Sequence, residues 1–246
     1  MDGAEIMLRA EGPAEGSCLP AIVVMPPGLQ SGTQDIETEW SKRLSGAGYW
    51  VFHWDPRGRG DSSGKESANG LEGASDAASI LRWVSSLTRI DSTRISVFSR
   101  SFGGALAAGA LGRFTDLKPN IWFDYESPGW LLDDIQYLDG YGREQMEHLS
   151  EDEQWWVDRS PAYWAPNVNV PYFRMQGIPD HAQGARMEHL QSLLRRIGTD
   201  QRFGNGEVIS KDSQLEEPIE WLYEGGLDVQ NISVTDWIIE EEWRYP

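Results

Sequence analysis

The stretch RISVFSRSFGGALAAGAL, residues 94–111, joins a short apolar run to a segment rich in alanine and glycine. The apolar run predicts a buried β-strand over 94–98, and the segment after it predicts a helix over 102–113. Ser101 lies at the junction. A serine on a sharp strand-to-helix turn has an exposed hydroxyl, and small neighbours let the helix pack closely on the strand. The stretch therefore indicates a serine nucleophile at the edge of a sheet, with a serine N-cap of an ordinary helix as the alternative.

The same alternation of apolar runs and amphipathic segments extends along the chain. Strands are expected at 21–25, 49–54, 94–98, 120–125, 171–176 and 219–224, with helices at 35–47, 72–88, 102–113, 183–197 and 234–243. This order predicts an α/β fold with a mostly parallel, twisted sheet and helices on both faces. Residues 127–165 do not follow this alternation of strands and helices, and they are rich in Trp, Tyr and acidic residues. We expect one domain over 1–246 with a small cap insertion at about 127–165.

The composition limits which binding partners and which cellular compartment are expected. The 246 residues carry a net charge of −18, which opposes binding to nucleic acid or to an anionic membrane surface. No apolar run is long enough for a membrane helix, and the first residues lack the basic and apolar regions of a signal peptide. The single Cys18 fits a reducing compartment. A cytoplasmic protein that does not associate with membranes is therefore expected.

A second loop supports the interpretation of Ser101 as a nucleophile. The stretch VVMPPGLQSG, residues 23–32, ends a predicted strand in a turn of proline and glycine. Such a turn beside the nucleophile can supply a backbone N–H for an oxyanion, and Leu29 is our candidate donor. Phe102 is the other candidate, because its amide follows the nucleophile at the start of a helix.

Together with these two loops, two further passages make the chain resemble the α/β-hydrolase superfamily. The loop WDPRGRGDSSG, residues 54–64, matches the D-x-R-G-x-G-x-S-x-G loop of that superfamily. The passage RSPAYWAPNVNVPYFRMQGIPD, residues 159–180, resembles prolyl-oligopeptidase-like and dienelactone-hydrolase-like enzymes. The resemblance covers nearly the whole chain and implies the α/β-hydrolase fold, with Asp180 at the position of the catalytic acid. Ser99 stands where the usual G-x-S-x-G motif has its first glycine.

The histidine of the family pattern is missing. Its position falls in WLYEGGLDVQN, residues 221–231, and no histidine follows residue 189. His181, next to Asp180, is a candidate for a relocated base that Asp124 or Glu126 would orient, and a plain loop residue is its alternative. His53 is expected to be a packed sheet residue.

Twelve tryptophans are a high count for this length. They predict either ordinary packing or an aromatic-walled pocket for an apolar or aromatic acyl group. The five in or next to the cap segment are Trp122, Trp130, Trp155, Trp156 and Trp164.

Taken together, the motifs predict a serine hydrolase of carboxylic esters or small amides with an incomplete or atypical triad. A small molecule is the expected substrate, no cofactor or metal is indicated, and a homodimer is left open. The alternative is a non-catalytic protein of the same fold that binds a ligand or partner. A lyase or cyclase that uses the same cleft is a weaker third hypothesis.

Overall fold

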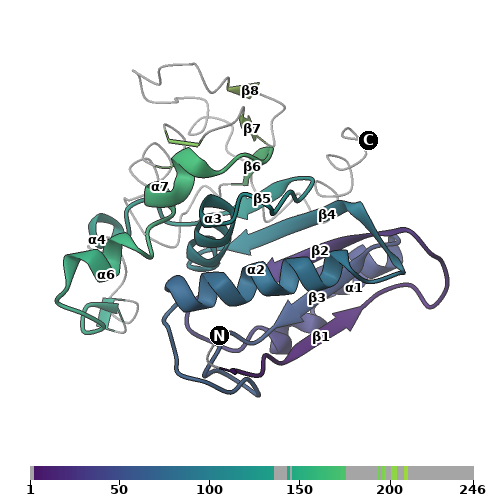
Figure 1. The fold of residues 1–246 in the computed structure, drawn as a ribbon, viewed down its shortest axis with the longest axis horizontal. Coiled ribbons are helices and arrows are strands. Elements are labelled where there is room, and N and C mark those ends of the chain that lie inside the picture. Colours follow the sequence, from purple (N-terminus) through teal and green to yellow (C-terminus); the bar gives the residue numbers. More distant parts are fainter. Residues whose placement is uncertain are drawn as a thin grey trace.

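The structure is a computed structural model that describes residues 3–135, 143–144, 146–175, 193, 196–197, 201–203 and 208–209. Within these ranges eight strands form one sheet, in the order β1-β3-β2-β4-β5-β6-β7-β8 (Figure 1). The strands are β1 (Leu8–Glu11), β2 (Leu19–Met25), β3 (Trp50–Trp54), β4 (Ile90–Arg100), β5 (Trp122–Tyr125), β6 (Tyr172–Met175), β7 (Gln201–Phe203) and β8 (Val208–Ile209). Strands β3, β2, β4, β5, β6 and β7 pair in parallel, and β1 and β8 add antiparallel edges.

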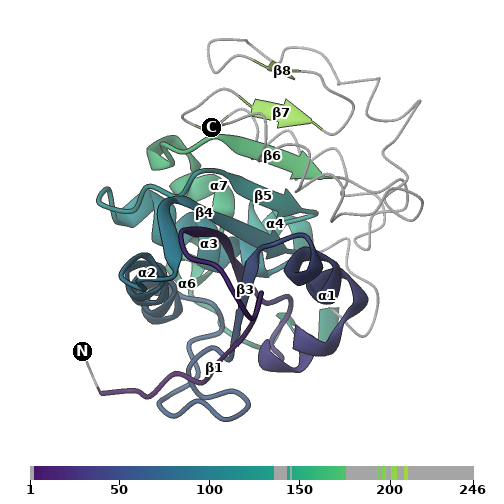
Figure 2. The same ribbon diagram turned by 90° about the vertical axis from the view of Figure 1, so that its right-hand side faces the viewer.

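Helices cover both faces of this sheet, as the sequence predicts. They are η1 (Thr33–Glu37), α1 (Glu39–Gly46), α2 (Leu71–Ser85), α3 (Gly103–Arg113), α4 (Leu131–Asp134), α6 (Glu153–Val157), α7 (Pro161–Trp164) and η3 (Ala165–Asn167). In Figure 2, α1 lies on one side of the sheet and α2 on the other. The segment expected to form the cap contains α4, α6 and α7.

Alternation along β2 explains the two hydrophobic layers. Ala21, Val23 and Met25 belong to the cluster that contains residues of α2 and α3, whereas Ile22 and Val24 belong to the cluster that contains Leu44 of α1. A strand whose successive side chains all meet apolar neighbours is buried on both faces, which is typical of a parallel sheet between helix layers.

Five of the six predicted strands are confirmed, with shifted ends, and the prediction over 219–224 lies outside the described residues. Strands β1, β7 and β8 were not predicted. The single helix expected over 35–47 is divided into η1 and α1 by Thr38, whose backbone is extended at φ −68° and ψ 151°. The Thr38 hydroxyl donates to Asp35 O at 2.7 Å and stabilises this break. The helix predicted over 234–243, and most of the one over 183–197, also lie outside the described residues.

Candidate active site

Ser101 lies directly after β4 and before α3, in a strained backbone conformation. Its φ is +49°, in the left-handed region that a non-glycine residue rarely adopts. Its N–H donates to Tyr125 O at 2.8 Å, which ties the turn to the end of β5. Phe102 is the N-cap of α3, which begins at Gly103. The turn is therefore the sharp strand-to-helix junction that the sequence predicts.

Contacts around the turn explain the residue types in the motif. A Cβ at Gly103 would collide with Met25 O, because α3 starts directly against the end of β2. Ser99, at the usual position of a glycine, is fully buried. Its hydroxyl accepts from Trp122 Nε1 at 2.8 Å and donates to Asp124 Oδ1 at 2.9 Å. The serine is accommodated here because two partners satisfy its hydroxyl.

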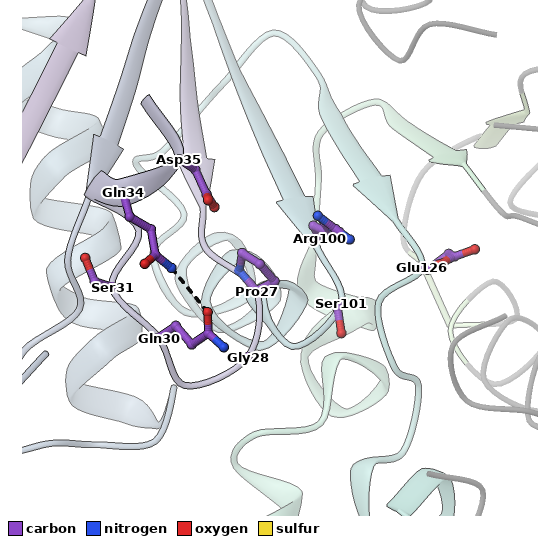
Figure 3. A pocket seen from close by; sticks show the side chains of 9 residues that line it. All are labelled: Pro27, Gly28, Gln30, Ser31, Gln34, Asp35, Arg100, Ser101 and Glu126. Atoms are coloured by element: carbon purple, nitrogen blue, oxygen red, sulfur yellow. Dashed lines mark hydrogen bonds between the residues drawn. The ribbon is translucent and has the colours of Figure 1, made fainter. Parts of the chain in front are cut away.

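A cavity of about 350 Å³ opens beside Ser101. Figure 3 shows the segment after β2 on one side of it, with Arg100 and Ser101 facing that segment from the end of β4. Gln34 Nε2 donates to Gln30 Oε1 at 3.2 Å along this wall. None of the tryptophans in the predicted acyl pocket is among the described lining residues. The lining is mostly polar: Pro27, Gly28, Gln30, Ser31, Gln34, Asp35, Arg100, Ser101 and Glu126.

The two predicted oxyanion donors lie on the loops that flank this cavity. Within the described ranges, neither the Leu29 nor the Phe102 amide donates to another backbone group. Their side chains pack into one apolar cluster with Leu131, Met146 and other cap residues. Neither residue is among the described lining of the cavity, but each adjoins lining residues, Leu29 between Gly28 and Gln30 and Phe102 after Ser101.

Asp55 holds the loop of Leu29 in place. Its carboxylate accepts from Ser31 Oγ at 2.5 Å, from Thr33 N at 2.8 Å and from Asp61 N at 3.0 Å. Burial alone would raise the pKa of Asp55, but these hydrogen bonds outweigh burial and lower the pKa. An ionised Asp55 therefore connects the loop after β2 to the loop after β3.

The two predicted orienting acids have different surroundings. Glu126 lines the cavity and has a positive φ of +54°. Asp124 does not line it: its side chain is fully buried and forms an ion pair with Arg174, with Arg174 Nη1 2.6 Å from Asp124 Oδ2. Tyr172 Oη donates to the same oxygen at 2.6 Å, and Ser127 Oγ donates to Oδ1. The geometry thus gives Asp124 partners within the sheet.

Neither described histidine reaches the cavity. His53 is buried in β3, where its Nε2 lies 3.1 Å from Ser41 Oγ, and burial lowers its pKa to about 4. His148 is largely exposed beside Glu147. The predicted acid and base, Asp180 and His181, lie outside the described residues.

The structure adds cavity residues that the sequence reasoning missed. Arg100 precedes Ser101, so the motif itself could have suggested it. Asp35 had no such signal, because it was assigned to a helix. Its half-burial raises its pKa, and the nearby Arg100 acts in the opposite direction.

The described part of the chain holds neither a metal-binding cluster nor a membrane-spanning helix. Over the described part of the chain, no group of three or more His, Cys, Asp or Glu side chains is placed to hold a metal ion. No helix within the same ranges combines the length and apolar character needed to cross a bilayer.

The strained serine turn, the loop after β2 and the parallel sheet agree with comparisons to known proteins. Residues 2–117 match the model of the X-Pro dipeptidyl-peptidase family (S15 family). An acetyl xylan esterase from Paenibacillus sp. R4 superposes with a TM-score of 0.64 at 13% identity, and the match covers 100% of this chain and 81% of that one. The chain has the fold of the α/β-hydrolases.

Two proteins are also similar to this chain in sequence. An uncharacterized protein of Mycobacterium tuberculosis is 34% identical over 94 residues, which are 38% of this chain and 32% of that protein. An uncharacterized peptidase of Bacillus subtilis is 25% identical over 178 residues, or 64% of this chain and 25% of the peptidase. The chain thus spans about a third and a quarter of the lengths of these two proteins. By their printed names, the similar proteins include peptidases and an esterase.

Proposed function

We propose that the protein is a serine hydrolase that cleaves carboxylic esters or small amides with Ser101 as the nucleophile. The observation that carries this proposal is the conformation of Ser101. A non-glycine φ of +49° costs about 1–3 kcal/mol and persists only where the surrounding structure holds it. Here it places the serine at a cavity, beside two loops that carry candidate oxyanion donors.

The proposed reaction uses the groups around this turn. Ser101 Oγ attacks the carbonyl carbon while a base takes its proton, and the negative charge that develops on the carbonyl oxygen is bound by the Leu29 and Phe102 amides. The C–O or C–N bond then breaks, the leaving group takes the proton, and water hydrolyses the acyl-enzyme. We propose Asp180 as the acid, because it matches the acid of the family pattern, and His181 as a relocated base, because it directly follows Asp180 in the chain.

The cavity favours a short acyl group. Its volume is about 350 Å³ and most of its described lining is polar. The acetyl xylan esterase that resembles the whole chain acts on acetyl esters by its name, whereas the relative named as a peptidase supports amides as well. An apolar or aromatic acyl group is the alternative, and it would require a surface outside this lining.

A second candidate function is a non-catalytic protein that binds a small ligand in the same cavity. It is favoured by the observation that neither His53 nor His148 lines the cavity. A lyase or cyclase that stabilises an enolate with the same amides is a weaker candidate.

Steady-state hydrolysis of p-nitrophenyl acetate separates these functions. The hydrolase proposal predicts turnover that falls about 10³-fold or more in Ser101→Ala. Equal rates in the two proteins would remove Ser101 from the reaction and favour the binding protein.

A further inference from the structure

Asn69 lies in the loop before α2 and connects the two segments that carry the oxyanion donors. Its side chain is only 1% exposed. Asn69 Nδ2 donates to Gly28 O at 3.3 Å and to Phe102 O at 3.0 Å. Gly28 precedes Leu29 in the loop after β2, and Phe102 follows the nucleophile. One amide group thus bridges the two sides of the proposed oxyanion hole.

The orientation of the Asn69 amide follows from its partners. Both are carbonyl oxygens, which can only accept, so the nitrogen of the side chain has to face them. Among the described residues the buried Asn69 Oδ1 has no hydrogen-bond partner. A carboxylate in the same place would point an oxygen at two carbonyl oxygens, which makes Asn different from Asp here.

The bridge acts directly on one oxyanion donor. Gly28 C=O and Leu29 N–H belong to the same planar peptide unit, and no described peptide bond is cis. In a trans peptide the N–H points away from the C=O. When Asn69 fixes the direction of Gly28 O, it therefore fixes the direction of the Leu29 N–H. At the other end it binds the carbonyl of Phe102, which belongs to the next peptide unit, and so holds the Leu29 segment against the turn that carries the second donor.

The loop that presents Asn69 is itself strained and held. Ala68 and Asn69 have φ of +47° and +58°, two consecutive non-glycine residues in the left-handed region. Arg159, from the cap segment, donates through Nε to Ala68 O at 3.0 Å and through Nη2 to Ser67 O at 2.6 Å. Its guanidinium is nearly buried and secures this conformation.

The bridge is not needed merely to satisfy the two carbonyls. Gly28 O also accepts from Arg59 Nη1 at 3.3 Å, and Phe102 O also accepts from Ala105 N at 3.2 Å. Loss of the Asn69 side chain would leave each carbonyl with one donor. What would be lost is the connection between the two segments.

We propose that Asn69 is a positioning residue of the oxyanion hole, whose side-chain amide sets the direction of the Leu29 N–H and the spacing between the Leu29 segment and the turn that carries the Phe102 N–H. This inference rests on the proposed serine hydrolase function. It predicts that loss of the bridge weakens binding of the developing oxyanion more than binding of the neutral substrate. The effect therefore falls on kcat and leaves KM nearly unchanged.

Asn69→Gly tests the bridge with little backbone strain, because glycine adopts φ near +58° freely. Ala68→Gly is the matched control, since it adds the same backbone freedom to the same loop and leaves the bridge intact. With p-nitrophenyl acetate we expect kcat of Asn69→Gly to fall about 10- to 100-fold relative to Ala68→Gly. Asn69→Asp, of equal size, is expected to lose at least as much, because its carboxylate repels both carbonyls.

Amide hydrogen exchange gives a second readout that does not depend on turnover. Exchange in the 28–34 segment is expected to be faster in Asn69→Gly than in Ala68→Gly. A kcat of Asn69→Gly within twofold of Ala68→Gly overturns the positioning role, whatever the exchange shows. If the wild type neither turns over ester nor reacts at Ser101, the proposed function fails. The exchange comparison then tests whether Asn69 holds the two segments together. Equal exchange in Asn69→Gly and Ala68→Gly would overturn that role.

Discussion

Arg174 of β6 and Asp124 of β5 form a fully buried ion pair, with Arg174 Nη1 2.6 Å from Asp124 Oδ2, under the edge of the sheet that carries Ser101. Ser99 of β4 donates to the same carboxylate, so the pair connects three neighbouring strands. Burial alone would lower the pKa of Arg174, but the contact with Asp124 outweighs burial and raises it. Burial, reinforced by Asp124, raises the pKa of Tyr172 well above its ordinary value. At neutral pH Arg174 is therefore charged and Tyr172 keeps its proton.

Removal of one partner from this pair should strongly destabilise the fold. Arg174→Met leaves a buried carboxylate without its cation, and we expect the free energy of unfolding to fall by about 3–5 kcal/mol. Urea denaturation measures the change. Arg82→Met is the control, because the Arg82–Asp116 pair lies at the surface and should contribute little. Similar losses in the two variants would contradict the importance of the buried pair.

Substitution of Gly103 tests the close contact between α3 and β2. The added methyl of Gly103→Ala would meet Met25 O, and overpacking of this kind costs about 1–3 kcal/mol of unfolding free energy. Gly46→Ala is the control, since a Cβ there meets nothing within 4 Å. Thermal or urea unfolding should show a loss for the first variant and none for the second. A Gly103→Ala protein as stable as the wild type would show that the contact is looser than described.

Burial of His53 predicts a pH dependence of stability. Its pKa is about 4 in the folded protein against an ordinary value of 6.5, so the unfolded state binds the proton first as pH falls. The contribution of His53 should make the protein about 2 kcal/mol less stable at about pH 5 than at about pH 7.5. The comparison is with His53→Gln, which cannot titrate, and the difference between the two pH profiles isolates this contribution. Parallel profiles would contradict a neutral, buried His53.

The cavity beside Ser101 predicts a preference for short acyl groups. We expect kcat/KM for p-nitrophenyl acetate to exceed that for the octanoate by about tenfold or more, because most of the described lining residues are polar and give a long alkyl chain little apolar surface to bury. A series from acetate through butyrate to octanoate measures this preference. Faster cleavage of the octanoate would instead support an apolar acyl pocket among the tryptophans.

Local patterns predicted the central strands and the serine turn, because both depend on a few consecutive residues. β1 escaped prediction because Leu8–Glu11 is a short edge strand that lacks an apolar run and is half exposed, and its partner β3 follows about 40 residues later in the chain.

The role of Asp124 could not be predicted for a different reason. A carboxylate at a strand end has the same sequence signature whether it faces a cavity or an arginine from the next strand. The pairing with Arg174 depends on the register of β5 against β6. Asn69 likewise gave no signal, because its partners Gly28 and Phe102 meet it only in the folded chain.

Reaction with a fluorophosphonate tests the nucleophile most directly. If the turn activates Ser101, intact-mass and peptide mass spectrometry should find one adduct, on the peptide that contains Ser101. The adduct should be absent in Ser101→Ala and unchanged in Ser79→Ala, which removes an exposed helical serine. A wild-type protein that stays unmodified, or a Ser101→Ala protein that reacts equally well, would contradict the account.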